Sequence, residues 1–273
     1  MVQLEEFGAL GLTDVTLEAI KAKGFETPSP IQKLTIPVLL DDEKTNDIIA
    51  QAQTGTGKTA AFGLPILERL RPQKGATQAL ILVPTRELAL QVTEEILSFN
   101  AKRKLVISPI YGGASMTEQL RRLGKGIDVV VGTPGRILDH LRRGTLDIKA
   151  LKYLILDEAD EMLNMGFTDS INAILADVPQ ERNTLLFSAT MSPEIARISK
   201  NYLHNAKEIT IGRKNESTSN VKHVAYTVQA KDKYAALKRI VDYYPQIYGI
   251  IFCRTRKETQ EIADKLMKEG YNA

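Results

Sequence analysis

A glycine-rich stretch, Ala52–Thr59, follows a short apolar run and precedes a helix-prone segment. Its pattern, A-x-x-x-x-G-K-T, differs from the usual phosphate-binding pattern in having alanine at the first position. Gly55 and Gly57 allow backbone N–H groups to turn inward around a phosphate, and the N-terminus of the next helix adds its positive end. Lys58 can reach the outer phosphates, and the hydroxyl of Thr59 can bind Mg²⁺. The stretch predicts a nucleotide site, with a glycine turn before an ordinary helix as the alternative.

Two adjacent carboxylates, Asp157 and Glu158, end the apolar run Tyr153–Leu156. Phosphoryl transfer needs a carboxylate for the metal and a group that orients the attacking water. We expect Asp157 to hold Mg²⁺ through water and Glu158 to act as the general base. Taken alone, these acids would equally well stabilise the N-terminus of the following helix. Together with Lys58 and Thr59 they predict one site, in which the four side chains face a bound triphosphate.

Short apolar runs without period-two alternation recur between residues 48 and 187, with helical patterns between them. Such runs are typical of strands buried on both faces. Strands are expected at Ile48–Ala50, Ala79–Val83, Leu105–Ile110, Val129–Val131, Tyr153–Leu156 and Thr184–Phe187, and helices at Arg86–Asn100, Met116–Leu123, Arg136–Arg142 and Pro193–Leu203. The alternation predicts an α/β fold, a parallel sheet with helices on both faces. The carboxyl edge of that sheet would bring the two motifs together.

The composition changes near residue 212, which predicts a first domain over residues 1–212. Residues 213–220 are polar and predict a linker. Residues 221–273 predict a further strand, helix, strand and helix, at Val221–Val228, Lys231–Tyr243, Tyr248–Cys253 and Lys257–Lys268. They look like the opening of a second α/β domain, and so short a piece buries little core by itself.

Composition excludes several classes of protein. The 273 residues are 43% apolar and 25% charged, as in soluble globular proteins, and no run approaches the roughly 18 apolar residues of a membrane span. No secretory signal opens the chain, and the single cysteine, Cys253, precludes an internal disulfide or zinc cluster, so we expect a cytoplasmic protein without a membrane partner. The net charge of +3 is too small to predict nucleic-acid binding, and residues 213–273 carry the positive excess.

The acidic motif, residues 157–160, spells D-E-A-D, and with its neighbours it resembles the DEAD-box ATP-dependent RNA helicases. The resemblance runs from Phe7 to about Thr255, with the motifs in the family's order. The other matching segments are the Q motif Gly24–Gln32, motif I Ala52–Thr59, motif Ia Pro84–Gln91, the pair Gly112–Gly113, the segment Thr133–Arg136, motif III Ser188–Thr190 and, loosely, motif IV Ile250–Thr255. The resemblance implies two RecA-like domains of the P-loop NTPase class, of which this chain would hold the first and the start of the second.

The resemblance also implies a role for each matching residue. ATP with Mg²⁺ would be bound by Phe7, Phe25, Gln32, Thr54, Gly55, Thr56, Gly57, Lys58 and Thr59, with Thr59 and Asp157 at the metal and Lys58, Asp157 and Glu158 in catalysis. The amide of Gln32 would read the adenine edge, which implies ATP rather than GTP. The RNA backbone would be contacted, without sequence readout, by Pro84, Thr85, Arg86, Gly113, Thr133, Pro134, Gly135 and Arg136. Ser188, Thr190 and Asp160 would couple hydrolysis to RNA binding, with both hydroxyls bonding the carboxylates of Asp157–Asp160.

Local chemistry alone leaves other interpretations open. Without the family, Gln32 would be assigned to a helix surface, Phe25 to the core, and Ser188 and Thr190 to a plain strand-to-helix turn. The RNA-contact set would be assigned to helix caps and to exposed helix residues.

The implied activity is ATP-dependent local unwinding of short RNA duplexes, or remodelling of RNA–protein complexes. The family's motifs V and VI would lie beyond Ala273, and motif VI supplies arginines to the ATP site, so we expect little or no unwinding by this chain. Two alternatives are an ATP-gated RNA clamp and a DNA-directed or translocating helicase. The segment Asp41–Asp47 departs from the family, in which a short Gly-Arg-Asp or similar stands before the first strand.

Overall fold

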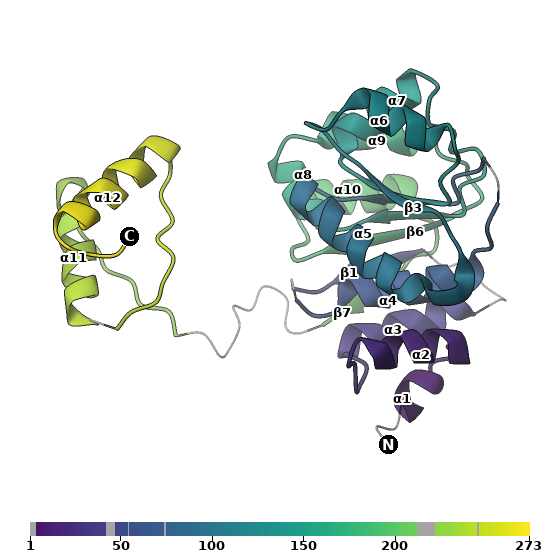
Figure 1. The fold of residues 1–273 in the computed structure, drawn as a ribbon, viewed down its shortest axis with the longest axis horizontal. Coiled ribbons are helices and arrows are strands. Elements are labelled where there is room, and N and C mark those ends of the chain that lie inside the picture. The colour runs from purple at the N-terminus through teal and green to yellow at the C-terminus, as the bar shows by residue number, and fades with distance from the viewer. Residues whose placement is uncertain (1–3, 42–46, 54, 74, 212–221, 245) are drawn as a thin grey trace. The chain divides into compact units, whose positions relative to one another are not determined.

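The computed structural model describes residues 4–41, 47–53, 55–73, 75–211, 222–244 and 246–273. The chain divides into two compact units, Met1–Glu216 and Ser217–Ala273. In the first unit, seven parallel strands form one sheet with helices on both faces (Figure 1). The strands are β1 (Ile48–Gln51), β2 (Ala79–Leu82), β3 (Ile107–Ile110), β4 (Val129–Gly132), β5 (Tyr153–Leu156), β6 (Asn183–Ser188) and β7 (Lys207–Thr210). The fold class predicted from the sequence is confirmed.

Helices cover the sheet in two groups. One core cluster joins a sheet face to α1 (Glu5–Gly8), α2 (Asp14–Ala22), α3 (Pro30–Leu40), α4 (Lys58–Arg69) and α5 (Arg86–Asn100). The other joins the opposite face to α7 (Pro134–Arg142), α8 (Ala159–Asn164), α9 (Thr168–Asp177) and α10 (Pro193–Tyr202), with α6 (Met116–Leu123) beside α7 (Figure 1). Successive strand residues alternate between the clusters, with Ile48 in the first and Ile49 in the second. This burial on both faces explains the unbroken apolar runs of the sequence.

The strand order places the predicted motifs at one edge of the sheet. The order is β3-β4-β2-β5-β6-β1-β7, so β5, β6 and β1 are neighbours. Asp157 follows β5, Ser188 ends β6, and the glycine-rich stretch follows β1. The backbone N–H of Ala52 donates to the carbonyl oxygen of Ser188 at 3.0 Å. Because parallel strands end at the same edge, these residues meet although they are far apart in the sequence.

Asp47 joins the starts of β1, β6 and β7 through buried hydrogen bonds. Its carboxylate accepts from the backbone N–H groups of Thr184 and His204, both at 2.6 Å. Its own carbonyl oxygen accepts from the N–H of Lys207 at 2.7 Å, and the residue is only 4% exposed. Loss of the carboxylate would leave the buried N–H of Thr184 and the partly buried N–H of His204 without acceptors, at a cost of about 1–3 kcal/mol each.

We therefore expect Asp47→Ala to lower the free energy of unfolding by about 2–4 kcal/mol, measured by urea titration followed by circular dichroism. Asp47→Asn keeps one carbonyl oxygen and is the matched variant, with a smaller expected loss. A loss of less than about 1 kcal/mol in Asp47→Ala would show that these bonds add little to stability.

Among its described residues, the second unit contains the α-helices α11 (Lys233–Tyr243) and α12 (Arg256–Lys268), close to the helices predicted there. The strands predicted at residues 221–228 and 248–253 are wrong for the described residues, because neither segment is paired in a sheet. Their apolar side chains, Tyr226 and Phe252 among them, are exposed. A strand needs a hydrogen-bonded neighbour, and an isolated pair of short strands is marginally stable at best.

Two further expectations fall on residues that the structure does not describe. The predicted linker, residues 213–220, and residues 42–46 of the segment that departs from the family lie outside the described residues. Across the described ranges, no helix combines the length and apolar character needed to cross a membrane.

Candidate functional site

Lys58 and Asp157 meet at the carboxyl edge of the sheet. Lys58 is the first residue of α4, and Asp157 directly follows β5. The Nζ atom of Lys58 lies 3.7 Å from Oδ1 of Asp157, and both side chains are almost fully buried. That distance is too long for a hydrogen bond, and Nζ has no hydrogen-bond partner among the described residues. A buried ammonium group in this position fits the oxygens of a phosphate.

The turn before α4 requires its glycines. Gly55 and Gly57 have φ angles of +80° and +87°, in the left-handed region that glycine adopts without strain. A Cβ atom on Gly57 would lie 2.5 Å from Nε2 of Gln32, so a side chain there would displace this amide. The hydroxyl of Thr56 donates to the carbonyl oxygen of Gln53 at 2.8 Å and closes the turn. Thr54, also predicted to bind the nucleotide, lies outside the described residues.

Asp157 and Glu158 have distinct environments. Burial raises the pKa of Asp157 to about 6; the Lys58 ammonium opposes this shift, and the charge of Glu158 adds to it. The backbone N–H of Glu158 donates to Oδ1 of Asp157 at 3.0 Å. Glu158 has a φ angle of +53°, which is uncommon for a residue other than glycine. Backbone strain of this kind clusters at functional sites, so the positive φ supports Glu158 as a candidate functional residue.

The oxygen donors at this edge suit Mg²⁺. Within the described ranges, no group of three or more His, Cys, Asp or Glu side chains could hold a metal ion. Mg²⁺ is usually bound by one or two protein oxygens together with waters and substrate phosphates. The carboxylate of Asp157 and the hydroxyl of Thr59, the second residue of α4, are oxygens of this type. The residues present therefore fit the predicted cation.

Gln32 connects the predicted adenine-reading segment to the glycine turn. It lies in the first turn of α3 and is 4% exposed, so its assignment to a helix surface is wrong. Its Oε1 accepts from the N–H of Ser29 at 2.9 Å, and its Nε2 donates to the carbonyl oxygen of Gly57 at 3.1 Å. The two segments are thus held together by one amide, which the sequence alone did not predict.

The two predicted aromatic residues differ in exposure. Phe7, in α1, is fully buried in the core cluster that also holds Ile31 of α3. Phe25 is partly buried and packs edge-on against Phe99, with ring centroids 6.1 Å apart. Phe7 is therefore placed to support α3 from the core, whereas Phe25 retains an exposed part.

The segment after β6 contacts the acidic motif through Thr190. Both the N–H and the hydroxyl of Thr190 donate to Oδ2 of Asp160, at 2.9 and 3.0 Å. The hydroxyl of Ser188 donates instead to the carbonyl oxygen of Thr190 at 2.7 Å. The expectation that both hydroxyls bind the acidic motif is thus correct for Thr190 and wrong for Ser188, because the tight turn brings a backbone acceptor closer.

The residues predicted to contact RNA occupy the other half of the same edge. Pro84–Arg86 follow β2, Gly113 follows β3 and Thr133–Arg136 follow β4, and these three strands are neighbours. The strands beside them, β5, β6 and β1, precede residues that are predicted to bind the nucleotide. The sheet edge thus divides into a half with these residues, called the nucleotide half, and a half with two arginines, Arg86 and Arg136.

In the arginine half, Thr85 and Thr133 make different local hydrogen bonds. The hydroxyl of Thr85 accepts from the N–H of Leu88 at 3.2 Å, as a helix cap does. The hydroxyl of Thr133 accepts from the N–H of Gly112 at 3.4 Å, which ties the glycine pair to the start of α7. Pro134 opens α7 at its first position, and Gly135 follows it. The cap alternative therefore describes Thr85 well, whereas Thr133 joins two predicted motifs.

Two buried polar side chains in this half were not predicted from the sequence. Gln119, in α6, is 4% exposed, and His140, in α7, is 0% exposed. Gln119 is one of several polar residues in a short amphipathic helix, and a lone histidine in a helix most often packs in a core. No sequence signal distinguishes them, and only their contacts with Arg136 and with each other do so.

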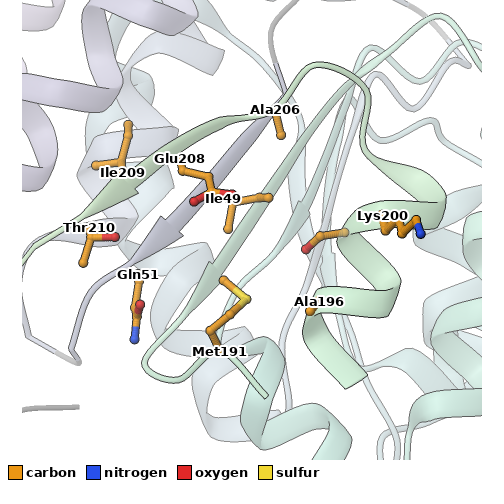
Figure 2. Close-up of a pocket in the computed structure, with 10 residues that line it drawn as sticks. Ile49, Gln51, Met191, Ala196, Lys200, Ala206, Glu208, Ile209 and Thr210 are labelled. Atoms are coloured by element: carbon orange, nitrogen blue, oxygen red, sulfur yellow. The ribbon is translucent and has the colours of Figure 1, made fainter. Parts of the chain in front are cut away.

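A cavity of about 410 Å³ lies on the sheet face between β1, β7 and α10 (Figure 2). None of the predicted site residues lines it. Gln51 lines the cavity, and its Nε2 donates to the carbonyl oxygen of Ala189 at 3.1 Å. This cavity is therefore distinct from the predicted nucleotide site.

The sequence and the fold are similar to those of known helicases. The family profile described as DEAD/DEAH box helicase matches residues 29–198. A crystal structure of a DEAD box protein from the hyperthermophile Methanococcus jannaschii is 43% identical, with a TM-score of 0.73, over 97% of this chain and 71% of that one.

Curated relatives share the same similarity over nearly the whole chain. A "DEAD-box ATP-dependent RNA helicase CshA" from Geobacillus kaustophilus is 45% identical over 267 residues, which are 98% of this chain and 56% of the relative. The protein of the same description from Bacillus subtilis is 42% identical over 98% of this chain and 53% of its own length. The chain thus spans about half the length of these relatives.

Proposed function

Because this chain belongs to the DEAD/DEAH box helicase family, we propose that it binds and hydrolyses ATP with Mg²⁺ at the edge formed by β5, β6 and β1. The observation that carries the proposal is the buried Lys58 ammonium, which lies beside Asp157 and lacks a hydrogen-bond partner among the described residues. Phosphate oxygens supply the acceptors that this group needs.

Each residue of the nucleotide half has a proposed role. Lys58 binds the outer phosphates, and the N–H groups of the turn from Thr54 to Thr59 surround them. Thr59 and Asp157 hold Mg²⁺, which when bound withdraws charge from the phosphates. Glu158 takes a proton from the attacking water. The adenine edge is read by Gln32, with Phe25 beside the base and Phe7 behind the segment.

The second proposed ligand is the backbone of single-stranded RNA. Arg86 and Arg136 provide charge-assisted hydrogen bonds to phosphates, and the segments Pro84–Thr85, Gly113 and Thr133–Gly135 provide N–H and hydroxyl groups. Contacts of this kind fix a strand in place without reading its sequence. Support comes from the shared sheet edge, where these groups adjoin the nucleotide half.

Coupling between the two ligands is proposed to pass through the contact between Thr190 and Asp160. Asp160 belongs to the acidic motif, three residues after Asp157, and its hydrogen bonds to Thr190 tie that motif to the end of β6. Ser188 shapes the same turn through the carbonyl oxygen of Thr190. ATP and RNA should then raise each other's affinity by the same factor, because coupling between binding sites is reciprocal.

For the whole protein we propose a cytoplasmic ATP-dependent RNA helicase that closes two RecA-like domains over ATP and RNA and separates short duplexes locally. The domains are residues 1–212 and 221–273, joined by residues 213–220, with the second domain partial. The relatives extend well beyond the length that this chain matches. We expect the 273-residue chain to bind ATP, to bind RNA weakly and to unwind little.

The proposal is tested by the dependence of nucleic-acid binding on ATP. Fluorescence anisotropy with a labelled single-stranded RNA decamer and with the DNA decamer of the same sequence should show tighter binding of RNA, strengthened by a non-hydrolysable ATP analogue. Equal binding of DNA would favour a DNA-directed helicase. RNA binding that the ATP analogue leaves unchanged would contradict the coupling of the two halves.

The alternative of an ATP-gated clamp is separated from an unwinding enzyme by a second measurement. Strand release from a short RNA duplex is followed with ATP, beside the lifetime of bound RNA with the analogue, on the full-length protein. A long RNA lifetime without strand release identifies a clamp. Robust multiple-turnover unwinding by residues 1–273 alone would contradict our expectation for this chain.

A further inference from the structure

Gln119 is a buried amide with partners at both ends. Its Nε2 donates to the carbonyl oxygen of Tyr111 at 2.9 Å. Its Oε1 accepts from Nη1 of Arg136 at 3.0 Å and lies 3.1 Å from Nε2 of His140. Because Nε2 of the amide faces a carbonyl oxygen, the oxygen end of the amide must face both Arg136 and His140.

This arrangement determines which nitrogen of His140 donates. Oε1 of Gln119 is only an acceptor, so Nε2 of His140 carries the proton between them. The other ring nitrogen, Nδ1, lies 2.8 Å from the hydroxyl of Thr145, whose single proton is shared between this nitrogen and the carbonyl oxygen of His140 at 3.1 Å. The bond from His140 to Gln119 therefore holds for the neutral and for the charged ring. Burial, together with the charges of Arg136 and Arg143, lowers the pKa of His140, and the charge of Asp139 opposes this shift.

Tyr111 links the amide of Gln119 indirectly to the second arginine of this half. The guanidinium carbon of Arg86 lies 5.2 Å from the centroid of the Tyr111 ring, a cation–π distance. Tyr111 is the residue whose carbonyl oxygen accepts from Gln119. Gln119 thus connects the segments after β3 and β4 directly, and the segment after β2 only through Tyr111.

We propose that His140 is a positioning residue for RNA: by holding the amide of Gln119 in one orientation, it fixes the spacing of Arg86 and Arg136. Two donors, from Arg136 and His140, require the amide oxygen on their side. Without the His140 donor, Oε1 of Gln119 accepts one hydrogen bond fewer, and the amide is held less firmly against a flip that exchanges Oε1 and Nε2. The inference rests on the proposed RNA function of the two arginines.

The test replaces His140 by phenylalanine, which keeps a buried ring and removes the donor. RNA affinity of the 273-residue chain is measured by anisotropy with the labelled RNA decamer over a range of salt concentrations. We expect His140→Phe to weaken binding about fivefold, as for the loss of one neutral hydrogen bond. The slope of log affinity against log salt should fall by up to about 0.7, because one phosphate contact is lost.

Three further variants make the result specific. His140→Gln retains an N–H donor and should restore most of the affinity, and His204→Phe changes an exposed histidine and should have no effect. Gln119→Met removes the amide itself and should weaken RNA binding at least as much as His140→Phe, which covers the case in which His140→Phe does not fold. ATP affinity, measured by calorimetry, should stay unchanged in all of them.

The outcomes separate the inference from the proposed function. If Arg136→Ala weakens RNA binding while folded His140→Phe and Gln119→Met bind with wild-type affinity and salt slope, His140 is not a positioning residue. A failure of His140→Gln to recover affinity would likewise point to packing alone. If the wild-type chain does not bind the RNA decamer, or if Arg136→Ala binds it with wild-type affinity, the proposed RNA surface itself is wrong.

Discussion

Lys58→Ala should abolish ATP binding, with a loss of affinity of at least about 100-fold in isothermal titration calorimetry with Mg²⁺ present. A hydrogen bond to a charged group is worth about 1.5–3 kcal/mol, and this ammonium can donate to more than one phosphate oxygen. The reason for so large an effect is that Nζ is buried in an ion pair with Asp157 and has no hydrogen-bond partner among the described residues. Its capacity to donate is therefore available to the ligand.

The control for this prediction is Lys200→Ala. Lys200 is an exposed lysine that lines the cavity between β1, β7 and α10 (Figure 2), so it reports on whether the nucleotide binds there instead. We expect the ATP affinity of Lys200→Ala to equal that of the wild-type chain. Unchanged affinity in Lys58→Ala, with a folded circular dichroism spectrum, would remove the phosphate assignment from the glycine turn. Loss of ATP affinity in Lys200→Ala would indicate that the nucleotide binds in the cavity between β1, β7 and α10.

The central strands and some helices could be predicted from the sequence because their residues give strong local signals. The strands that lie inside the sheet are buried on both faces, so they form apolar runs that cannot be mistaken for an exposed surface. The helix Met116–Leu123 has the predicted bounds, and Ser115 caps it by accepting from the N–H of Glu118. Such signals lie within a few residues of the element that they define.

Other elements were missed because their signals are weak or contradictory. The edge strand β7 buries only Ile209 and exposes its other three residues, so its sequence lacks an apolar run. The helix α3, for which the sequence predicted no bounds, contains Pro37, a residue that usually argues against a helix interior. The predicted strands of the second unit show the opposite error. Their apolar residues suggested burial, but a sheet partner is a tertiary property that no local pattern contains.

The candidate site was predicted in its residue types and only partly in its contacts. The approach of Lys58 to Asp157 follows from parallel topology, which the alternation of strands and helices implied. The amide of Gln32 on Gly57 and the pair of Gln119 with His140 could not be predicted. A buried amide bonds whichever groups packing brings to it, and its partners here come from other elements.

Glu158→Gln should keep ATP affinity and reduce hydrolysis by about 100-fold or more, because general base catalysis contributes typically 10²–10⁴-fold. Glutamine has nearly the same shape, and the bond from the backbone N–H of residue 158 to Asp157 does not involve the side chain. The left-handed backbone at this position, with φ of +53°, is kept as well. The substitution thus removes the base and preserves the phosphate and metal groups around it.

Glu161→Gln is the matched control, since Glu161 is an exposed acid of the same motif segment in α8. Phosphate release under single-turnover conditions should be normal in the control and nearly absent in Glu158→Gln, with equal ATP affinities by calorimetry. Because the proposed function couples RNA and ATP affinities, a variant that binds ATP without hydrolysing it should also hold RNA longer than the wild-type chain. Normal turnover in Glu158→Gln would remove the residue from the base role and require another group to accept the proton of water.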